Sequence, residues 1–326
     1  MGGFVIALLL LRPGSFSQAI GQSSPTSHLP PPTLSYTPHR VYDTHHKQFI
    51  DFEAFVSGLT GADLVFVGEE HDDPATHRME LALLEGIARQ RDSVVLALEM
   101  FERDVQPLLN RYLTGAVPED SLLAHGRPWK NYRTDYRPLI ELARGRSWPV
   151  LASNVPRPMA SLVARAGLSA LDTLSAEARR NGAERLGCPE DSYYDRFVKS
   201  MGDLSAHGPP SPPPANGPTE SPKARIGRLY EAQCLKDETM GESVAAAWRP
   251  GRLIVHYNGS FHSDFREGTV TRAERRLRQA GGRKVLVVTA VPVADLDLLK
   301  PDKKDRKRAD YLLYVLGPAK PDSAKR

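Results

Sequence analysis

Cysteine is scarce in this 326-residue sequence, which contains only Cys188 and Cys234. Two cysteines are too few for a disulfide framework, and their spacing matches no zinc-ligand motif. The sequence leaves open whether they form one bridge in an oxidising compartment or stay as free, buried thiols. A chain of this length can bury an ample core, so its stability need not depend on cross-links.

The sequence also lacks an apolar run long enough to span a bilayer. The apolar segment 4–11 has only the length of a signal-peptide core, and Ser17-Gln18-Ala19 offers a small-x-small cleavage site after it. A basic segment before the apolar core is missing. We nevertheless expect residues 1–19 to be a signal peptide and the protein to be exported, periplasmic or associated with the cell envelope. No cysteine follows at a lipobox, so a lipid anchor is not predicted.

Charge of one sign is not in large excess, since the formal net charge is +4. The basic residues gather in the run 303–308 and at Arg272, Arg275, Arg276 and Arg278. Nucleic-acid binding would call for a basic face with stacking aromatic side chains. Neither is evident here, so we interpret these residues as solvated faces and predict no nucleic-acid partner.

Two segments rich in proline and small polar residues divide the chain. Residues 20–40 and 205–222 cannot bury enough apolar surface to order themselves, which predicts a disordered linker and a proline-rich insertion. We expect residues 41–317 to form the folded domain, with a helical cap over about residues 102–247 that includes the insertion. Residues 318–326 are expected to be a tail.

Between these segments, short runs rich in β-branched residues alternate with longer amphipathic runs. This pattern predicts an α/β fold, a mostly parallel central sheet flanked by helices with a smaller helical cap lobe. The predicted strands are residues 64–67, 94–98, 150–153, 253–257 and 285–289, with 311–316 as an additional edge strand. The predicted helices are residues 76–89, 104–113, 136–144, 156–166, 191–201, 226–248 and 271–279.

Ionisable residues follow three of the predicted strands. Glu69 and His71 come after the first strand, Glu99 ends the second, and His262 follows the strand that breaks at Gly259. Ligands of open α/β sheets bind beyond the carboxyl ends of the strands, which predicts a common site for these side chains. If the second strand lies beside the first, Glu99 comes within reach of His71.

Neighbouring residues have simpler interpretations. Asp73 before Pro74 is expected to cap the next helix. Glu70 and Asn154 fit a site role and an ordinary loop role equally well, and His256 lies inside a strand. Four further histidines have no such context and are expected at the surface; they are His45, His46, His77 and His125.

Two further groups suit a ligand with a flat apolar body and carboxylates. Gln233 and Asp237 share one face of the long predicted helix 226–248 with Tyr230, Met240 and Gly241. That face fits ligand contact and simple helix packing equally well. The second group is Trp129, Tyr132, Arg133 and Tyr136. Aromatic rings stack on flat ligands and arginine pairs with carboxylates, although core packing explains each residue of this group as well.

These motifs together resemble the ChaN-like haem-binding uptake family, which is similar to the wider Tiki, TraB and erythromycin-esterase superfamily. The resemblance covers about residues 41–289. It rests on ordered motifs at several strand ends, and the residues that carry it are Val67-Gly68-Glu69-Glu70-His71-Asp72, Leu98-Glu99-Met100-Phe101, Gln233 and Asp237 within 230–241, and Gly259-Ser260-Phe261-His262.

The resemblance implies a protein that binds haem for iron uptake at the cell envelope, as a homodimer around haem or as part of a transport system. An axial histidine or tyrosine would then face a flat slot, with basic residues near the propionates. Residues expected around haem are His71, His262, Tyr132, Tyr136, Tyr257, Arg133, Gln233 and Asp237.

The wider superfamily implies an alternative, a metal-dependent hydrolase such as a Tiki-like protease or an esterase. In that case a divalent metal, or directly activated water, would lie among Glu69, His71, Glu99 and His262. The absent lipobox cysteine departs from an anchored lipoprotein, and the insertion 205–222 alters the lobe that would close over haem. No separate oxyanion-binding group is evident, which favours haem binding or transport.

Overall fold

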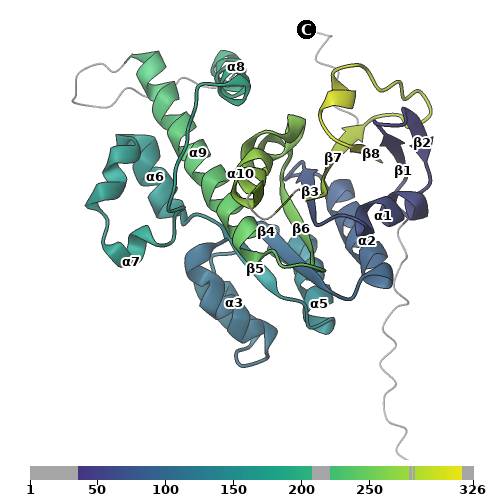
Figure 1. Cartoon of the computed structure of the whole chain (residues 1–326), viewed down its shortest axis with the longest axis horizontal. Coiled ribbons are helices and arrows are strands. Elements are labelled where there is room, and N and C mark those ends of the chain that lie inside the picture. Colours follow the sequence, from purple (N-terminus) through teal and green to yellow (C-terminus); the bar gives the residue numbers. More distant parts are fainter. Residues whose placement is uncertain (1–35, 208–220, 279–280, 282, 318–326) are drawn as a thin grey trace, which may run out of the picture. The chain divides into compact units, whose positions relative to one another are not determined.

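Eight strands of the described chain form one mixed sheet in the order β2-β1-β8-β7-β3-β6-β4-β5. The computed structural model describes residues 36–207, 221–278, 281 and 283–317, drawn in colour in Figure 1. The strands are β1 (His39–Asp43), β2 (Gln48–Ile50), β3 (Leu64–Glu69), β4 (Val94–Glu102), β5 (Val150–Asn154), β6 (Leu253–Gly259), β7 (Val285–Val293) and β8 (Tyr311–Leu316).

Five neighbouring strand pairs, from β8 to β5, are parallel, whereas β1 pairs antiparallel with both β2 and β8. The α/β fold with a mostly parallel sheet is thus confirmed. The prediction that 311–316 is an edge strand is wrong, because β1 covers the open side of β8. β1 begins at His39, so the last two residues assigned to the linker 20–40 belong to the sheet.

Helices cover both faces of the sheet. The α-helices are α1 (Phe52–Thr60), α2 (Pro74–Gln90), α3 (Gln106–Leu113), α4 (Glu119–His125), α5 (Arg137–Gly145), α6 (Arg157–Ala166), α7 (Ala176–Arg179), α8 (Ser192–His207), α9 (Pro222–Ala247) and α10 (Gly268–Leu277). A π-helical turn spans Tyr132–Tyr136, and short 3-10 turns span Arg103–Val105, Leu168–Thr173, Ser260–His262, Asp264–Arg266 and Asp305–Lys307.

The side chains of each strand alternate between two cores because successive residues point to opposite faces. On β3, Val65 and Val67 join the core under α1 to α5, while Leu64 and Phe66 join the core under α9 and α10. Both faces of the strand are therefore apolar, as expected of a parallel strand buried on two sides.

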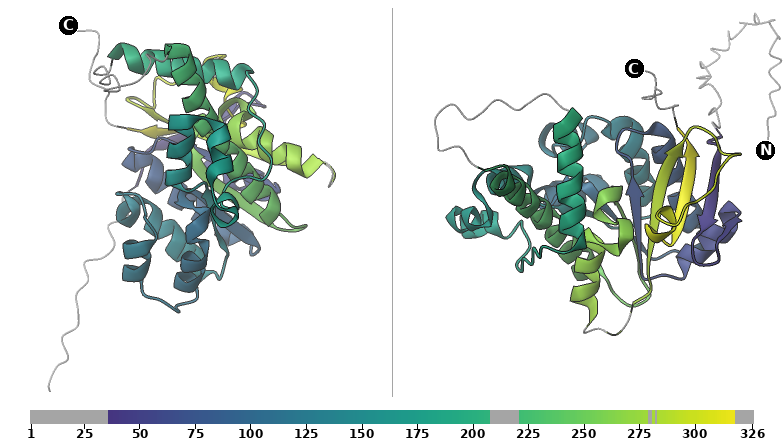
Figure 2. Two further views of the ribbon diagram at one scale, coloured as in Figure 1. Left: turned by 90° about the vertical axis from the view of Figure 1, so that its left-hand side faces the viewer. Right: turned by 90° about the horizontal axis from the view of Figure 1, so that it is seen from above.

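The predicted cap range 102–247 divides into two parts. Residues of α3, α4 and α5 pack in the core of the main sheet. Separate apolar clusters hold α6 and α8 against the first half of α9, and these helices with α7 form a lobe beside the sheet (Figures 1 and 2). The expected signal peptide 1–19, the expected tail 318–326 and most of the predicted linker and of the insertion 205–222 lie outside the described residues.

Cys188 and Cys234 form a disulfide across a sequence separation of 46 residues. Cys188 lies in the segment before α8, and Cys234 is fully buried on α9. The bridge thus joins the loop of the lobe to its long helix. Of the two alternatives left open by the sequence, the structure has the bridge.

No helix among the described residues combines the length and apolar character required to cross a membrane.

Removing the bridge is expected to destabilise the protein. Closing a loop of this length restricts the unfolded chain, and loss of such a bridge typically costs about 2–4 kcal/mol. The Cys188→Ser/Cys234→Ala variant should therefore unfold at lower urea concentration than the wild type. Dithiothreitol should lower the wild-type midpoint towards that of the variant and leave the variant unchanged. A wild-type midpoint that is insensitive to the reductant would show that the thiols are not paired.

Candidate functional site

The ends of three parallel strands deliver the candidate residues to one edge of the sheet. Glu69 is the last residue of β3, Glu99 lies near the end of β4, and Gly259 ends β6 just before the turn that carries His262. β6 lies between β3 and β4, so the second predicted strand is not adjacent to the first. The ends of all three strands still meet, because parallel strands finish at the same edge.

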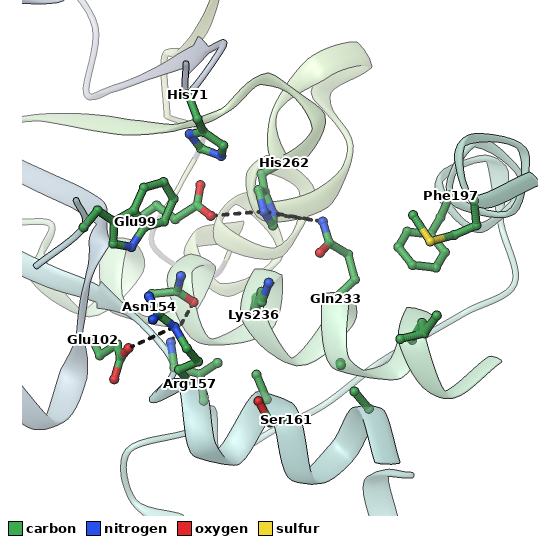
Figure 3. Close-up of a pocket in the computed structure, with 17 residues that line it drawn as sticks. His71, Glu99, Glu102, Asn154, Arg157, Ser161, Phe197, Gln233, Lys236 and His262 are labelled. Atoms are coloured by element: carbon green, nitrogen blue, oxygen red, sulfur yellow. Dashed lines mark hydrogen bonds and ion pairs between the residues drawn. The ribbon is translucent and has the colours of Figure 1, made fainter. Parts of the chain in front are cut away.

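A cavity of about 470 Å³ opens at this edge, between the sheet and the lobe (Figure 3). Its volume lies in the range of small-molecule sites. One side is polar and includes His71, Glu99 and His262, while α6, α8 and α9 supply a largely apolar wall. The lining residues are His71, Glu99, Glu102, Trp129, Asn154, Val155, Arg157, Ala160, Ser161, Ala164, Phe197, Met201, Leu229, Ala232, Gln233, Lys236 and His262.

His71 is held from behind by Glu69. Its Nδ1 lies 2.6 Å from Oε1 of the buried Glu69 carboxylate, while the imidazole side chain is 38% exposed. Burial disfavours the charged ring, but the hydrogen bond to Glu69 and the negative charge of Glu99 outweigh it and raise the pKa of His71. Nε2 has no hydrogen-bond partner among the described residues, which leaves it free to coordinate a ligand.

Gly259 and two aromatic rings fix the position of the His71 ring. A Cβ atom at residue 259 would lie 2.6 Å from Nε2 of His71, so only glycine allows this close approach. Trp129 packs edge-on against His71 at 4.8 Å between ring centroids. The Tyr136 hydroxyl donates a hydrogen bond of 2.6 Å to the same Glu69 oxygen that His71 contacts. The orientation of His71 is therefore set by β3, β6 and the π-helical turn before α5.

His262 lies between two buried carboxylates. Its Nδ1 is 2.7 Å from Asp237 Oδ1, and its Nε2 is 3.4 Å from Glu99 Oε1. Burial disfavours its charged form, yet the charges of Glu99 and Asp237 prevail and raise the pKa of His262 to about 10. His262 is thus an imidazolium at neutral pH, with both nitrogens occupied.

The two carboxylates around His262 are themselves well supported. Glu99 accepts a 2.8 Å hydrogen bond from the Gly259 backbone N–H, and although burial opposes ionisation, the His262 charge holds the pKa of Glu99 far below its usual value. Asp237 accepts hydrogen bonds from the Tyr193 hydroxyl at 2.6 Å and from the Thr269 hydroxyl at 2.8 Å. Each buried charge of this row therefore has partners, as buried charges require.

Several predicted site residues lie outside the cavity lining. The Tyr132 hydroxyl donates to Glu119 at 3.2 Å, and Arg133 is exposed to solvent. Tyr257 donates to the backbone oxygen of Glu80 at 3.0 Å. Burial raises the pKa of Tyr132, Tyr136 and Tyr257, and so disfavours their phenolate forms.

The remaining candidates divide between the cavity and the interior. Gln233 lines the cavity beside His262, whereas Asp237 lies behind it. Asn154 lines the cavity while its own Oδ1 accepts from the Val155 backbone. His256 is fully buried between Ser153 and Asn258, and its burial lowers its pKa to about 4. It is a structural histidine.

Two buried residues of α2 were missed by the sequence analysis. His77 and Glu80 are only 3% and 1% exposed, so the prediction that His77 lies at the surface is wrong. The helical period explains the difference, because His77 and Glu80 repeat on the same face as the buried Leu84 and Ile87. α2 does begin as predicted, with Asp73 accepting from the backbone N–H groups of Ala75 and Thr76.

Two cavity cations were also missed. Arg157 comes from the first turn of α6, and Lys236 lies on α9 one residue before Asp237. Lysine and arginine are frequent on exposed helix faces, so the sequence alone gave no reason to select these two. Only the packing of α6 against α9 brings them to one cavity.

The four residues expected to hold a divalent metal do not form a compact ligand set. Within the described residues, the group whose ligand atoms all lie within 4.8 Å of one another is Glu69, His77 and Glu80. Both nitrogens of His262 face carboxylates of its own network, so neither nitrogen is directed at an ion shared with His71.

A family described as haem-binding uptake, Tiki superfamily, ChaN, matches residues 55–273, which is more than half of the chain. The chain belongs to this ChaN family. The match includes the β3 end, the lobe and the β6 end, and therefore every cavity-lining residue of this ChaN-family chain.

One solved structure shares the fold of this chain. It is described as cofacial heme binding to ChaN of Campylobacter jejuni, at 18% identity and a TM-score of 0.62, over 86% of this chain and 97% of that chain. A structure of bacterial protein toxins matches at 13% identity over 73% and 36% of the two chains, and the type III effector HopBA1 at 12% over 80% and 90%. Their TM-scores of 0.38 lie below the level that indicates a common fold. No curated protein matches the sequence.

The charged state of His262 predicts a pH dependence of stability. A raised pKa in the folded state contributes stability that is complete below the unfolded value and disappears as the pH rises through the folded value. The free energy of unfolding of the wild type, relative to His262→Gln, should therefore fall between about pH 6.5 and pH 10. Urea unfolding at pH 6, 8 and 10 tests this. His125→Gln, at an exposed histidine, should show no such trend, and a constant difference for His262→Gln would refute the buried imidazolium.

Proposed function

We propose that this ChaN-family protein binds haem in the cavity at the carboxyl edge of the sheet and serves haem uptake. The observation that carries the proposal is His71, whose imidazole lines a cavity of about 470 Å³ with an apolar wall and whose Nε2 makes no hydrogen bond to the described residues. Membership of a haem-binding uptake family supports the same ligand. When bound, haem would supply an iron centre that accepts a lone pair from an imidazole nitrogen.

We propose His71 as the residue that would coordinate the haem iron. A coordinating imidazole is oriented and made more basic when its other nitrogen donates to a carboxylate. Glu69 accepts from Nδ1 of His71 at 2.6 Å, which selects the tautomer with its lone pair on Nε2. Tyr136 donates to the same carboxylate oxygen and keeps it in place. The chain thus contains a ligand, an orienting carboxylate and a group that fixes the carboxylate.

The cavity wall fits a flat ring bearing carboxylates. Ala160 and Ala164 of α6 and Leu229 of α9 offer small or apolar surface, and Phe197 of α8 offers an aromatic ring. Lys236 lies on the polar side and makes no ion pair within the described part of the chain. Arg157 is 4.0 Å from the Glu102 carboxylate. We propose Lys236 and Arg157 as partners of the haem propionates.

His262 has a different role in this proposal. Its two nitrogens are engaged by Asp237 and Glu99, so it contributes positive charge to the cavity and no lone pair. Gln233 lies 3.4 Å from its ring and extends the polar side (Figure 3). Tyr132 and Tyr136 lie outside the cavity lining and donate hydrogen bonds to Glu119 and Glu69, while Arg133 is exposed to solvent.

Export is part of the proposal. A disulfide between Cys188 and Cys234 persists in oxidising compartments and is rare in the reducing cytosol. This agrees with the signal peptide expected at residues 1–19. The homodimer around haem and the association with an envelope transport system are implied by the family resemblance, and they stay predictions.

The alternative metal-dependent hydrolase has no specific observation in its favour. Glu69 points to His71 and Tyr136, while Glu99 and Asp237 surround His262. These contacts separate the four residues into two pairs, so we derive no hydrolytic step from them.

Hemin titration tests the haem proposal. The wild type should give a saturable Soret shift, and His71→Ala should weaken binding by about 100-fold or more. Loss of an outer partner such as Glu69 costs about 10–100-fold in comparable sites, so loss of the ligand itself should exceed that range. His125→Ala is the matched control at an exposed histidine and should bind as the wild type does. A wild type without a saturable shift would rule out the function, and full binding by His71→Ala would rule out the ligand.

The propionate partners are tested separately. Lys236→Gln should weaken hemin binding by about tenfold while leaving the Soret maximum of the complex unchanged, because the charge contacts the periphery and not the iron. The effect of the substitution should decrease at high ionic strength. Lys130→Gln, an exposed lysine outside the lining, is the control. A shifted Soret maximum or unchanged affinity in Lys236→Gln would contradict the assignment.

A further inference from the structure

A second cluster of ionisable residues lies behind the cavity, between the end of β3 and the first turns of α2. It consists of Glu69, His77 and Glu80, which are 2%, 3% and 1% exposed. None of the three lines the cavity. Their ligand atoms lie within 4.8 Å of one another. An acidic cluster alone does not make a site. The hydrogen bonding of these groups, however, leaves two buried carboxylate oxygens without a donor.

The His77 ring has a defined tautomer. Its Nε2 lies 3.0 Å from the backbone carbonyl oxygen of His71, and since a carbonyl only accepts, Nε2 carries the hydrogen. Asn131 donates to the same oxygen at 3.2 Å. In the neutral ring the lone pair is therefore on Nδ1, which lies 2.9 Å from Glu80 Oε2 and 3.9 Å from Glu69 Oε2. A lone pair thus faces two carboxylates.

Two oxygens of the cluster have no donor. Glu69 Oε2 and Glu80 Oε1 are buried and make no hydrogen bond to the described residues. An unpaired buried charge costs several kcal/mol or more, so native proteins pair such groups or bind a metal. Glu69 Oε2 is also directed at His77, as the 3.9 Å separation shows.

We propose that Glu69, His77 and Glu80 bind a divalent transition-metal ion, with Zn²⁺ as the best match. Zinc takes imidazole nitrogen and carboxylate oxygen at about 2.0–2.2 Å, and neighbouring ligands around it lie about 3–4 Å apart. The separations of 2.9 and 3.9 Å from His77 Nδ1 fit this spacing. The donated hydrogen bond from Nε2 to a backbone carbonyl is the usual outer partner of a metal-bound histidine.

The proposed site is distinct from the haem cavity, and Glu69 connects the two through its contact with His71. Oε1 of Glu69 contacts His71 and Tyr136, while Oε2 of the same carboxylate faces His77. A bound cation would tie the end of β3 to α2 directly behind His71. It would therefore stabilise the fold and need not touch any cavity ligand.

Zinc binding to the full chain tests this site. Protein stripped with a chelator is dialysed against Zn²⁺, and in a second arm against Mn²⁺, before its metal content and thermal unfolding are measured. We expect one Zn²⁺ per chain and a higher melting temperature. Glu80→Gln, which can donate to Glu69 in place of a metal, should keep the fold but lose at least tenfold in zinc affinity. Glu85→Gln, at an exposed position of the same helix, should bind as the wild type does.

A further variant separates the two sites. His71→Ala removes a cavity side chain and should retain zinc. Zinc lost from His71→Ala but kept in Glu80→Gln would place the ion in the cavity and overturn the proposal, as would an absence of zinc binding by the wild type. X-ray absorption at the zinc edge of the wild type needs no variant. One imidazole nitrogen with oxygen ligands is expected, and sulfur or several imidazole ligands would overturn the proposal.

Discussion

The arrangement of the site depends on one buried carboxylate, that of Glu69. One of its oxygens is shared by His71 and Tyr136, and the other faces His77 across the interior. A carboxylate buried to this extent is stable only with such partners. Its position is fixed because Glu69 is the last residue of β3, paired on one side with Gly259 of β6. The parallel sheet thereby places the imidazole of His71 at the mouth of the cavity.

A second buried row of charges completes the polar side of the cavity. The charges of Asp237, His262 and Glu99 alternate in sign. Each of the three residues comes from a different element, namely α9, the turn after β6, and β4. The row binds the lobe helix to the sheet edge by charge as well as by apolar packing. This explains why His262 is suited to setting the local electrostatic potential, whereas His71, with one free nitrogen, is suited to coordination.

Much of the fold could be predicted from the sequence because buried parallel strands leave a strong signal. The five runs of β-branched residues were found, and the polar residues that follow them mark the correct edge. The order of the strands could not be predicted from the sequence, because β6 is placed between β3 and β4 by packing between segments that are far apart in the chain. β1 and β2 are short and carry no comparable apolar run.

The candidate site was predictable where residues follow strands and not where they lie on helices. Glu69, His71, Glu99 and His262 were identified by their position after a strand. His77 and Glu80 could have been found from their spacing with Leu84 and Ile87, since that spacing places them on the buried face of α2. Lys236 and Arg157 offered no such signal, because their meeting depends on how α6 and α9 pack in the lobe.

The central claim is that His71, oriented by Glu69, would coordinate the iron of haem bound in this cavity. Resonance Raman spectroscopy of the ferrous complex reports it most directly, because the iron–histidine stretch depends on the hydrogen bond at the other ring nitrogen. The account predicts an iron–histidine band in the wild type, a shift of that band to lower frequency in Glu69→Gln, and its loss in His71→Ala. A band that is unchanged in both variants, or phenolate ligation in the wild type, would contradict it.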